Sequence, residues 1–260
     1  MSMAMKQVKA ARAKNRLTGK QVIDSIITDF FELHGDRRFA DDPAIVAGVG
    51  KLFHLPVTII AMEKGSNTKD KIQRNFGSAN PEGYRKALRL MRQAEKFGRP
   101  VICIVDTAGA FCGIGAEERG QGQAIAENLM EMMALKVPII SVLIGEGGSG
   151  GALALAVADQ VWMMEQAIYS VISPEGCASI LWKDEKKVAN AADSLKLTAQ
   201  DMLNFSVIER IIPEENISVE KQMKSLQENL YQTLEQLMKL EQETLLENRY
   251  QRFRKFGKPS

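Results

Sequence analysis

The spacing of hydrophobic positions changes along the chain, and each spacing indicates either a helix or a strand. After Thr18, which with Gln21 resembles a capping box, apolar residues recur at helical spacing and predict an amphipathic helix that ends near Gly35. Residues 44–52 and 57–63 are short β-branched runs separated by a few residues. These runs predict two strands joined as a hairpin.

Two longer helical patterns lie on either side of the middle of the chain. The first begins at Pro81 and ends before Gly98. The second runs from Ser218 to about Tyr250, which is much longer than an average helix. A helix of that length usually packs on a neighbouring element or on a partner chain.

The middle of the chain repeats one order of elements. A buried-strand pattern at residues 101–106 is followed by a glycine-containing loop and a predicted helix from about residue 117 to 135. A strand at residues 137–144, a second glycine loop and a further helical segment repeat this order. Such units predict parallel strands with right-handed crossovers, so both loops should lie at one edge of the sheet. Two further short strands and a turn are expected at residues 161–164, 168–172 and 173–176.

The composition fits one cytoplasmic domain. With 260 residues, 45% of them hydrophobic, the chain can bury a sizeable core, and its formal charge of +2 gives no support for nucleic-acid binding. Cys103, Cys112 and Cys177 are far apart, which argues against a disulfide framework or a zinc site. No apolar run approaches the ~18 residues of a membrane span. The basic residues before Asp24 are interpreted as a solvated arm rather than an organellar presequence.

Glycine fills five of the eight positions at residues 145–152, Gly-Glu-Gly-Gly-Ser-Gly-Gly-Ala, between the predicted strand and helix. With few side chains in the way, main-chain N–H groups can approach a ligand closely, and a helix N-terminus favours negative charge. The loop is therefore suited to an anion or a developing oxyanion.

Several interpretations fit this loop. Ser149 lies in a nucleophile-elbow pattern, but both histidines, His34 and His54, precede it, whereas in α/β-hydrolases the histidine follows. Gly145, with Glu165 further on, fits a dinucleotide fingerprint, yet that motif normally opens the first βα unit of a domain. A backbone oxyanion hole needs no titratable side chain. Tight strand–helix packing without a ligand would explain the motif equally well.

Seven longer stretches carry more information than their spacing. They lie at residues 31–37, 74–77, 81–89, 106–110, 115–121, 145–152 and 169–182. Together they closely resemble the alpha subunits of bacterial acetyl-CoA carboxylase carboxyltransferases, from about residue 16 to 210. The chain departs from many members at residues 213–218, where the family often has a glycine-rich, histidine-containing segment.

The resemblance implies an α/β, crotonase-like fold of stacked ββα units with a long C-terminal helix. Residues 1–16 would be a basic arm, residues 17–212 the carboxyltransferase domain, and residues 213–260 a helical extension of that domain. The implied reaction moves a carboxyl group from carboxybiotin, on the biotin carboxyl carrier protein, to acetyl-CoA, and so forms malonyl-CoA for fatty-acid synthesis.

The resemblance also implies partners. A beta subunit would complete an α2β2 heterotetramer and would carry the only zinc, so no metal is expected here. The biotin carboxylase of the wider complex would use the ATP, and this chain would bind none. Neither a membrane nor a nucleic acid is an expected partner. The alternatives are a subunit of a biotin-dependent acyl-CoA decarboxylase, a subunit of another acyl-CoA carboxylase, or a non-catalytic assembly subunit.

The site residues follow from the same resemblance. The backbone N–H groups of Gly150 and Gly151 would stabilise the ureido oxyanion of biotin. The wall of the biotin pocket would be formed by Gly109, Ala110, Gly147 and Gly148. A glycine pair on the beta subunit would hold the thioester enolate. Since the biotin anion can itself accept the α-proton of the thioester, no histidine base is required.

A basic stripe on the helix that begins at Pro81 is a further candidate for substrate or partner binding. Arg85, Arg89, Arg92 and Lys96 follow one another at i, i+4, i+7 and i+11, and like charges at this spacing slightly destabilise a helix. An anionic partner would offset this cost. It could be the phosphates of CoA, an acidic face of the beta subunit or the carrier protein. The alternative is a solvated helix face.

Overall fold

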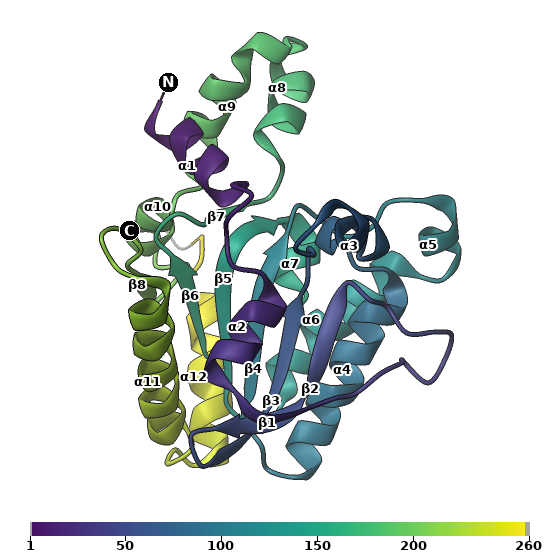
Figure 1. Ribbon diagram of the computed structural model, residues 1–260, viewed down its shortest axis with the longest axis vertical. Coiled ribbons are helices and arrows are strands. Elements are labelled where there is room, and N and C mark those ends of the chain that lie inside the picture. Colours follow the sequence, from purple (N-terminus) through teal and green to yellow (C-terminus); the bar gives the residue numbers. More distant parts are fainter. Residues whose placement is uncertain (1, 258–260) are drawn as a thin grey trace.

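The computed structural model describes residues 2–257 and is built on one mixed β-sheet (Figure 1). The strands follow the order β1-β2-β3-β4-β5-β6-β8, and β7 pairs with β5 off this path. The β1–β2 and β2–β3 pairs are antiparallel, and all other pairs are parallel. The strands are β1 (Thr28–Glu32), β2 (Ile45–Leu52), β3 (Leu55–Met62), β4 (Val101–Thr107), β5 (Ile139–Gly148), β6 (Gln160–Met164), β7 (Ile168–Ser170) and β8 (Arg210–Ile212).

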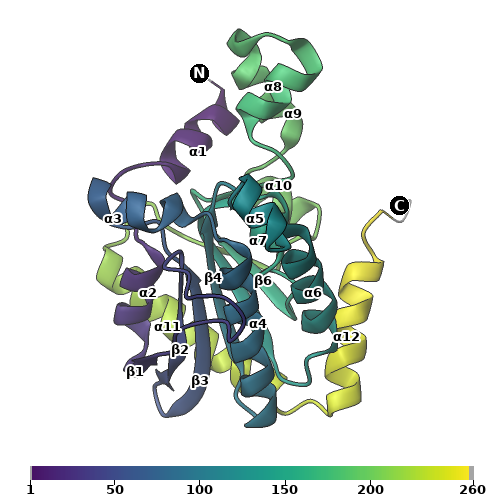
Figure 2. The ribbon, with the colours of Figure 1, turned by 90° about the vertical axis from the view of Figure 1, so that its right-hand side faces the viewer.

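Helices cover both faces of the sheet (Figure 2). On one face α2 packs against α11, and on the other α4 packs against α6, which also contacts α12. The helices are α1 (Met3–Ala11), α2 (Gly19–Ile26), α3 (Thr68–Gln73), α4 (Pro81–Lys96), α5 (Ile114–Glu118), α6 (Gln121–Ala134), α7 (Ser149–Leu153), α8 (Pro174–Trp182), α9 (Val188–Leu195), α10 (Ala199–Asn204), α11 (Val219–Leu237) and α12 (Gln242–Arg254), with short 3₁₀ turns at Asn75–Gly77 and Glu185–Lys187.

The sheet confirms the organisation predicted for the middle of the chain. β2 and β3 form the expected hairpin, and β4 is buried along its whole length between parallel neighbours. The loops that follow β4 and β5 lie at the same edge, as parallel strands require. Within residues 2–257, no helix combines the length and apolar character that a membrane span requires.

The helix predicted to end near Gly35 is shorter, because sheet pairing takes over from helical spacing. Helix α2 ends at Ile26, and residues 28–32 form β1, antiparallel to β2. A Cβ on Gly48 of β2 would lie 2.8 Å from the ring of Phe30. The glycine therefore lets an aromatic side chain pack closely over the hairpin, which a continued helix could not achieve.

The predicted C-terminal helix is also divided. Helix α11 ends at Leu237, and α12 begins at Gln242 and covers the opposite face of the sheet. Buried Arg249 holds α12 there, since it donates to the carbonyl oxygens of Met132 and Leu135 at the end of α6. Tertiary hydrogen bonds thus hold α12 on the face opposite to α11, which a single continuous helix could not reach.

Two smaller predictions also need correction. Ser173 caps α8 through a hydrogen bond from the Gly176 N–H, so residues 173–176 begin a helix and are not an isolated turn. The helix predicted for residues 117–135 is interrupted at Gly120, whose φ of 80° lies in the left-handed region. Glycine tolerates this conformation at little steric cost.

The N-terminal arm is packed, which contradicts its interpretation as a solvated segment. Helix α1 lies against α9 in a layer that projects beyond the carboxyl edge of the sheet (Figures 1 and 2). Val8 is fully buried, in a small apolar cluster with Ile168, Ala192 and Leu197. The arm therefore belongs to the folded unit.

Candidate functional site

The two glycine loops meet at the carboxyl edge of β4 and β5. A Cβ on Gly148 would overlap the carbonyl oxygen of Ala108, and a Cβ on Gly151 would overlap the amide nitrogen of Ala110. The predicted loops are therefore in van der Waals contact through their backbones. Only glycine at positions 148 and 151 permits this approach.

Open space remains beside this contact. A Cβ on Gly109 would have no neighbour within 4 Å, and one on Gly150 would meet only Ile125, at 3.7 Å. Gly147 differs, because a Cβ there would meet the side chains of Leu143 and Tyr169. Gly147 therefore serves packing under the loop, while Gly109 and Gly150 lie where a ligand could approach the backbone.

Helix α7 presents backbone donors at this edge. Its first residue, Ser149, has a φ of +49°, a strained value for a residue other than glycine. The first N–H groups of a helix have no carbonyl partner within it, and here they belong to Ser149, Gly150 and Gly151. Because α7 has only five residues, its dipole is small, and the individual N–H groups are the relevant donors.

A buried charged network supports the loops from below. The Lys64 Nζ lies 2.7 Å from Oδ1 of Asp106 and 3.4 Å from Oε1 of Glu146, and the Glu146 N–H donates to the Asp106 carboxylate at 2.7 Å. Burial raises the pKa of Asp106, and Lys64 partly opposes this shift. The ends of β4 and β5 are thus locked together by a lysine from the segment after β3.

The arm closes this network on its outer side. Arg12 Nε lies 3.1 Å from Glu146, and its Nη1 lies 2.7 Å from Glu175 at the start of α8. A cavity of about 350 Å³ opens between arm residues 11–18 and the loop ends, and Lys64 and Glu146 line it. The arm therefore forms one wall of the candidate site.

None of these network residues was among the sequence-predicted site residues. Asp106 ends a buried strand and Glu146 is the only charged residue among the glycines, and these two signals could have drawn attention to them. Lys64 and Arg12 had no comparable signal, because they reach the site through contacts with residues far away in the sequence.

Tyr84 of α4 approaches the site from inside the protein. Its side chain is fully buried, its hydroxyl has no hydrogen-bond partner among residues 2–257, and it lies 3.1 Å from where a Cβ of Gly151 would be. Burial, and secondarily the charge of Asp42, raises the pKa of this hydroxyl. Tyr84 thus packs behind the contact of Gly151 with Ala110 as a neutral side chain.

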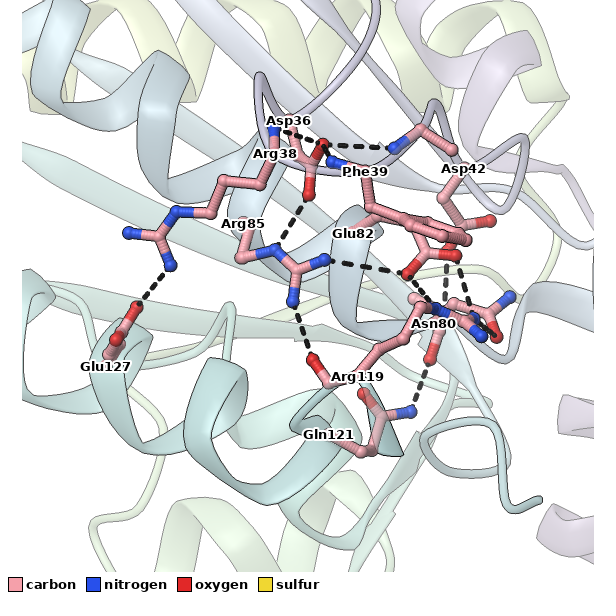
Figure 3. A network of polar contacts seen from close by, with 12 residues as sticks. Asp36, Arg38, Phe39, Asp42, Asn80, Glu82, Arg85, Arg119, Gln121 and Glu127 are labelled. Carbon is pink, nitrogen blue, oxygen red and sulfur yellow. Dashed lines mark hydrogen bonds and ion pairs between the residues drawn. The ribbon is translucent and has the colours of Figure 1, made fainter. Parts of the chain in front are cut away.

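The basic stripe on α4 is not a uniform solvated face. Arg85 Nε lies 2.7 Å from the buried carboxylate of Asp36, and its Nη1 donates to the carbonyl of Arg119 at 2.9 Å (Figure 3). Arg89 donates to loop carbonyls, whereas Lys96 is exposed. Arg85 therefore has its anionic partner within the chain.

The hydrolase and dinucleotide interpretations find no support in these contacts. His34 contacts Asp41 and His54 contacts Tyr231, so neither ring is placed to activate Ser149. The carboxylate of Glu165 accepts the N–H groups of residues 214 and 215 and is already used structurally. Within the described residues, no group of three or more His, Cys, Asp or Glu side chains could hold a metal ion.

The family model described as "Acetyl co-enzyme A carboxylase carboxyltransferase-like" matches residues 2–257. The chain belongs to this family. The match extends beyond residues 16–210, on which the sequence resemblance rested, and it includes the divergent segment at 213–218.

Close relatives support the same assignment. The acetyl-coenzyme A carboxylase carboxyl transferase subunit alpha of Ruminiclostridium cellulolyticum is 58% identical over 254 residues, which cover 98% of each chain. That of Streptococcus uberis is 57% identical over 249 residues, 96% of this chain and 97% of the relative. The predicted family and its carboxyltransferase activity in acetyl-CoA carboxylase are thus confirmed.

Solved structures confirm the crotonase-like fold class. Transcarboxylase 12S superposes with a TM-score of 0.69 at 18% identity, over 84% of this chain and 42% of that chain. The MdcD-MdcE hetero-dimer of a Pseudomonas malonate decarboxylase gives a TM-score of 0.63 at 17% identity, over 76% of this chain and 83% of that chain. At such low identity the likeness concerns the fold alone.

Proposed function

We propose that this chain forms the biotin-binding half of a composite carboxyltransferase site. The carrying observation is the backbone contact of Gly151 with Ala110, which brings two glycine loops together at the edge where α/β sheets bind ligands. The edge offers N–H donors and open backbone beside Gly109 and Gly150. A neutral cradle rich in donors suits a cofactor that develops negative charge on an oxygen.

In this proposal, the N–H groups of Gly150 and Gly151 donate to the ureido oxygen of biotin, and Gly109, Ala110 and Gly148 line the pocket. Gly147 acts behind them through packing. When bound, carboxybiotin would supply the carboxyl group and a proton acceptor. The Lys64–Asp106–Glu146 network would keep the donors in fixed positions, so that little reorganisation is needed when charge develops.

The proposal requires a second chain. A beta subunit would hold acetyl-CoA and its enolate and carry the zinc ribbon, and the two chains would assemble as α2β2. The biotin carboxyl carrier protein would deliver the cofactor after the separate biotin carboxylase had used ATP to load it. All of these steps are proposed to take place in the cytoplasm.

The test is to express the full chain with its candidate beta subunit and to assay decarboxylation of malonyl-CoA to acetyl-CoA with free biotin. Each chain alone should be inactive, and the mixture should be active. Activity of either chain alone would contradict a shared site. Comparison of acetyl-CoA with longer acyl-CoA substrates in the forward direction would show which acyl groups the assembled enzyme accepts.

A further inference from the structure

A second cavity, of about 330 Å³, lies between the loop at residues 33–44 and helix α4. None of its lining residues belongs to the two glycine loops. Five arginines and only two carboxylates, those of Asp36 and Glu127, line it. The arginines are Arg37, Arg38, Arg85, Arg89 and Arg92. The cavity lining therefore carries an excess of positive charge.

Two of the arginines have carboxylate partners within the chain. Arg85 pairs with Asp36 at 2.7 Å, and Arg92 pairs with Glu131 at 3.0 Å. These two side chains therefore have partners of opposite charge and need no external anion.

The other three arginines have little compensation. Within residues 2–257, neither Arg37 nor Arg89 has a carboxylate within 4.0 Å, and Arg38 has only Glu127, at 3.9 Å. Arg37 donates to the carbonyl of His34 at 2.8 Å, and Arg89 donates to the same oxygen at 3.2 Å. A carbonyl oxygen orients a guanidinium but carries no net charge to balance it.

The pKa of Arg89 also reflects the shortage of nearby negative charge. Partial burial, and then the nearby charge of Arg37, lowers the pKa of Arg89, and the carboxylates of Asp41 and Asp36 only partly oppose the shift. Arg37 and Arg89 thus repel each other across a partly desolvated space. An anion placed between them would relieve this repulsion.

The loop that creates this arrangement is firmly built. Asp36 is buried, and its Oδ1 accepts the N–H groups of Arg38, Phe39 and Ala40 at 2.9, 2.7 and 3.2 Å (Figure 3). Arg37 has a φ of +65°, a left-handed value that is strained at a residue other than glycine. Such strain persists where surrounding contacts impose it, and here it presents Arg37 beside Arg89.

We propose that this cavity binds a phosphate group, held by Arg37, Arg38 and Arg89. A phosphate brings up to about two negative charges and several acceptor oxygens, which matches three guanidinium groups better than one carboxylate does. The hollow is at the lower end of the size range of small-molecule sites, about 300–1,000 Å³. Inorganic phosphate, nucleotides and CoA all carry such a group, and the test below distinguishes them. The proposal does not rest on the carboxyltransferase site proposed above.

The test is isothermal titration calorimetry, in which the full-length chain is titrated with inorganic phosphate, ADP or CoA at low salt. The wild type should bind either all three ligands or ADP and CoA alone. For each ligand that binds, the affinity should fall about tenfold or more in Arg37→Gln, Arg38→Gln and Arg89→Gln, because each variant removes charge-assisted hydrogen bonds. The matched control is Lys96→Gln, which removes the same charge from an exposed position on α4 outside the cavity. Its affinity should equal that of the wild type.

Arg38→Gln keeps the test independent of folding, since the Arg38 side chain is 61% exposed and holds no loop carbonyl. Tighter binding of CoA than of ADP would identify CoA as the source of the phosphate, and equal binding would favour a nucleotide. Absence of binding by all three ligands, or binding that the three variants leave unchanged, would overturn the inference. If the wild type bound no phosphate and the variants lost subunit assembly, the inference would also be overturned, because the arginines would then pair with carboxylates on a protein partner.

Discussion

The backbone of Gly151 lies against the amide nitrogen of Ala110 so closely that even a single methyl group at position 151 would overlap it. Gly150 is its direct neighbour, yet a Cβ there would have ordinary contact with Ile125 at 3.7 Å. Two adjacent glycines therefore have different reasons to lack a side chain. Only the substitution at position 151 must separate the two loops.

We expect Gly151→Ala to lower carboxyl transfer by about 100-fold in the assembled enzyme, the scale for the loss of an oxyanion donor. Gly150→Ala keeps its N–H and its methyl group would meet only Ile125, so folding and assembly should be unchanged, and any loss of transfer would come from the methyl group in the space proposed for biotin. Malonyl-CoA decarboxylation with free biotin measures both variants. If both were fully active, the chain would be an assembly subunit rather than half of the catalytic site.

Removal of the Tyr84 hydroxyl should stabilise the protein. This buried hydroxyl has no partner among residues 2–257, which is unfavourable, so Tyr84→Phe should raise the free energy of unfolding by about 1 kcal/mol and leave transfer unchanged. The control is Tyr231→Phe, which loses hydrogen bonds to His54 and Glu235 and should not gain stability. Denaturant titration gives both values. A fall in transfer for Tyr84→Phe at unchanged stability would instead indicate that the hydroxyl contacts a ligand.

Arg249 should tolerate no replacement by lysine. Its buried guanidinium binds both carboxylate oxygens of Asp159 at 2.8 Å and three backbone carbonyls, and a lysine cannot reproduce that fork. A lysine would keep the charge beside Asp159 but leave buried carbonyls without donors, so we expect Arg249→Lys to destabilise the protein by about 1–3 kcal/mol. The control is Arg254→Lys, at the exposed end of α12. Equal unfolding midpoints for these two variants would contradict the role of Arg249 as the anchor of α12.

Asp42 should make stability depend on pH. Burial raises the pKa of its carboxyl from 3.8 to about 6, against hydrogen bonds from the N–H groups of Ala44 and Asn80. The folded state therefore binds this proton more tightly than the unfolded chain, so the stabilisation is present at low pH and is lost as the pH rises through about 6. The shift corresponds to about 3 kcal/mol.

The measurement for Asp42 is the difference in unfolding free energy between the wild type and Asp42→Asn at several pH values. Relative to the variant, the wild type should lose stability between about pH 4 and pH 7. The lowered pKa values of Asp36 and Asp41 act in the opposite direction, but they are common to both proteins and cancel in the difference. A difference that stays constant with pH would refute the assignment.

Local patterns were sufficient for the elements that make the catalytic edge. The hairpin, the buried strand β4 and helix α4 each have a pattern that is complete within 18 residues, and parallel connection then brings the two glycine loops together. The end of α2 could not be predicted in the same way. It depends on pairing of Phe31 with Val49, a contact with another strand.

The charged network beneath the site could not be predicted from the sequence either, because it also depends on contacts between distant segments. Lys64 meets Glu146 across 82 positions, and Arg12 meets it across 134. In the sequence, a lysine or arginine that pairs with a buried carboxylate cannot be distinguished from one that is exposed to solvent. Only the fold shows that these cations are used to balance carboxylates buried at the ends of β4 and β5.

The packed arm has a consequence for the order of folding. Helix α1 has nine residues, fewer than the ~12–15 that an isolated helix needs in water, so it depends on its contacts with α9. Arg16, just after it, pairs with Glu214, 198 positions later. Segments that lie early in the sequence must therefore wait until the distal part of the chain is in place. The wall of the cavity beside the glycine loops therefore includes a contact that can form only after residue 214 has been synthesised.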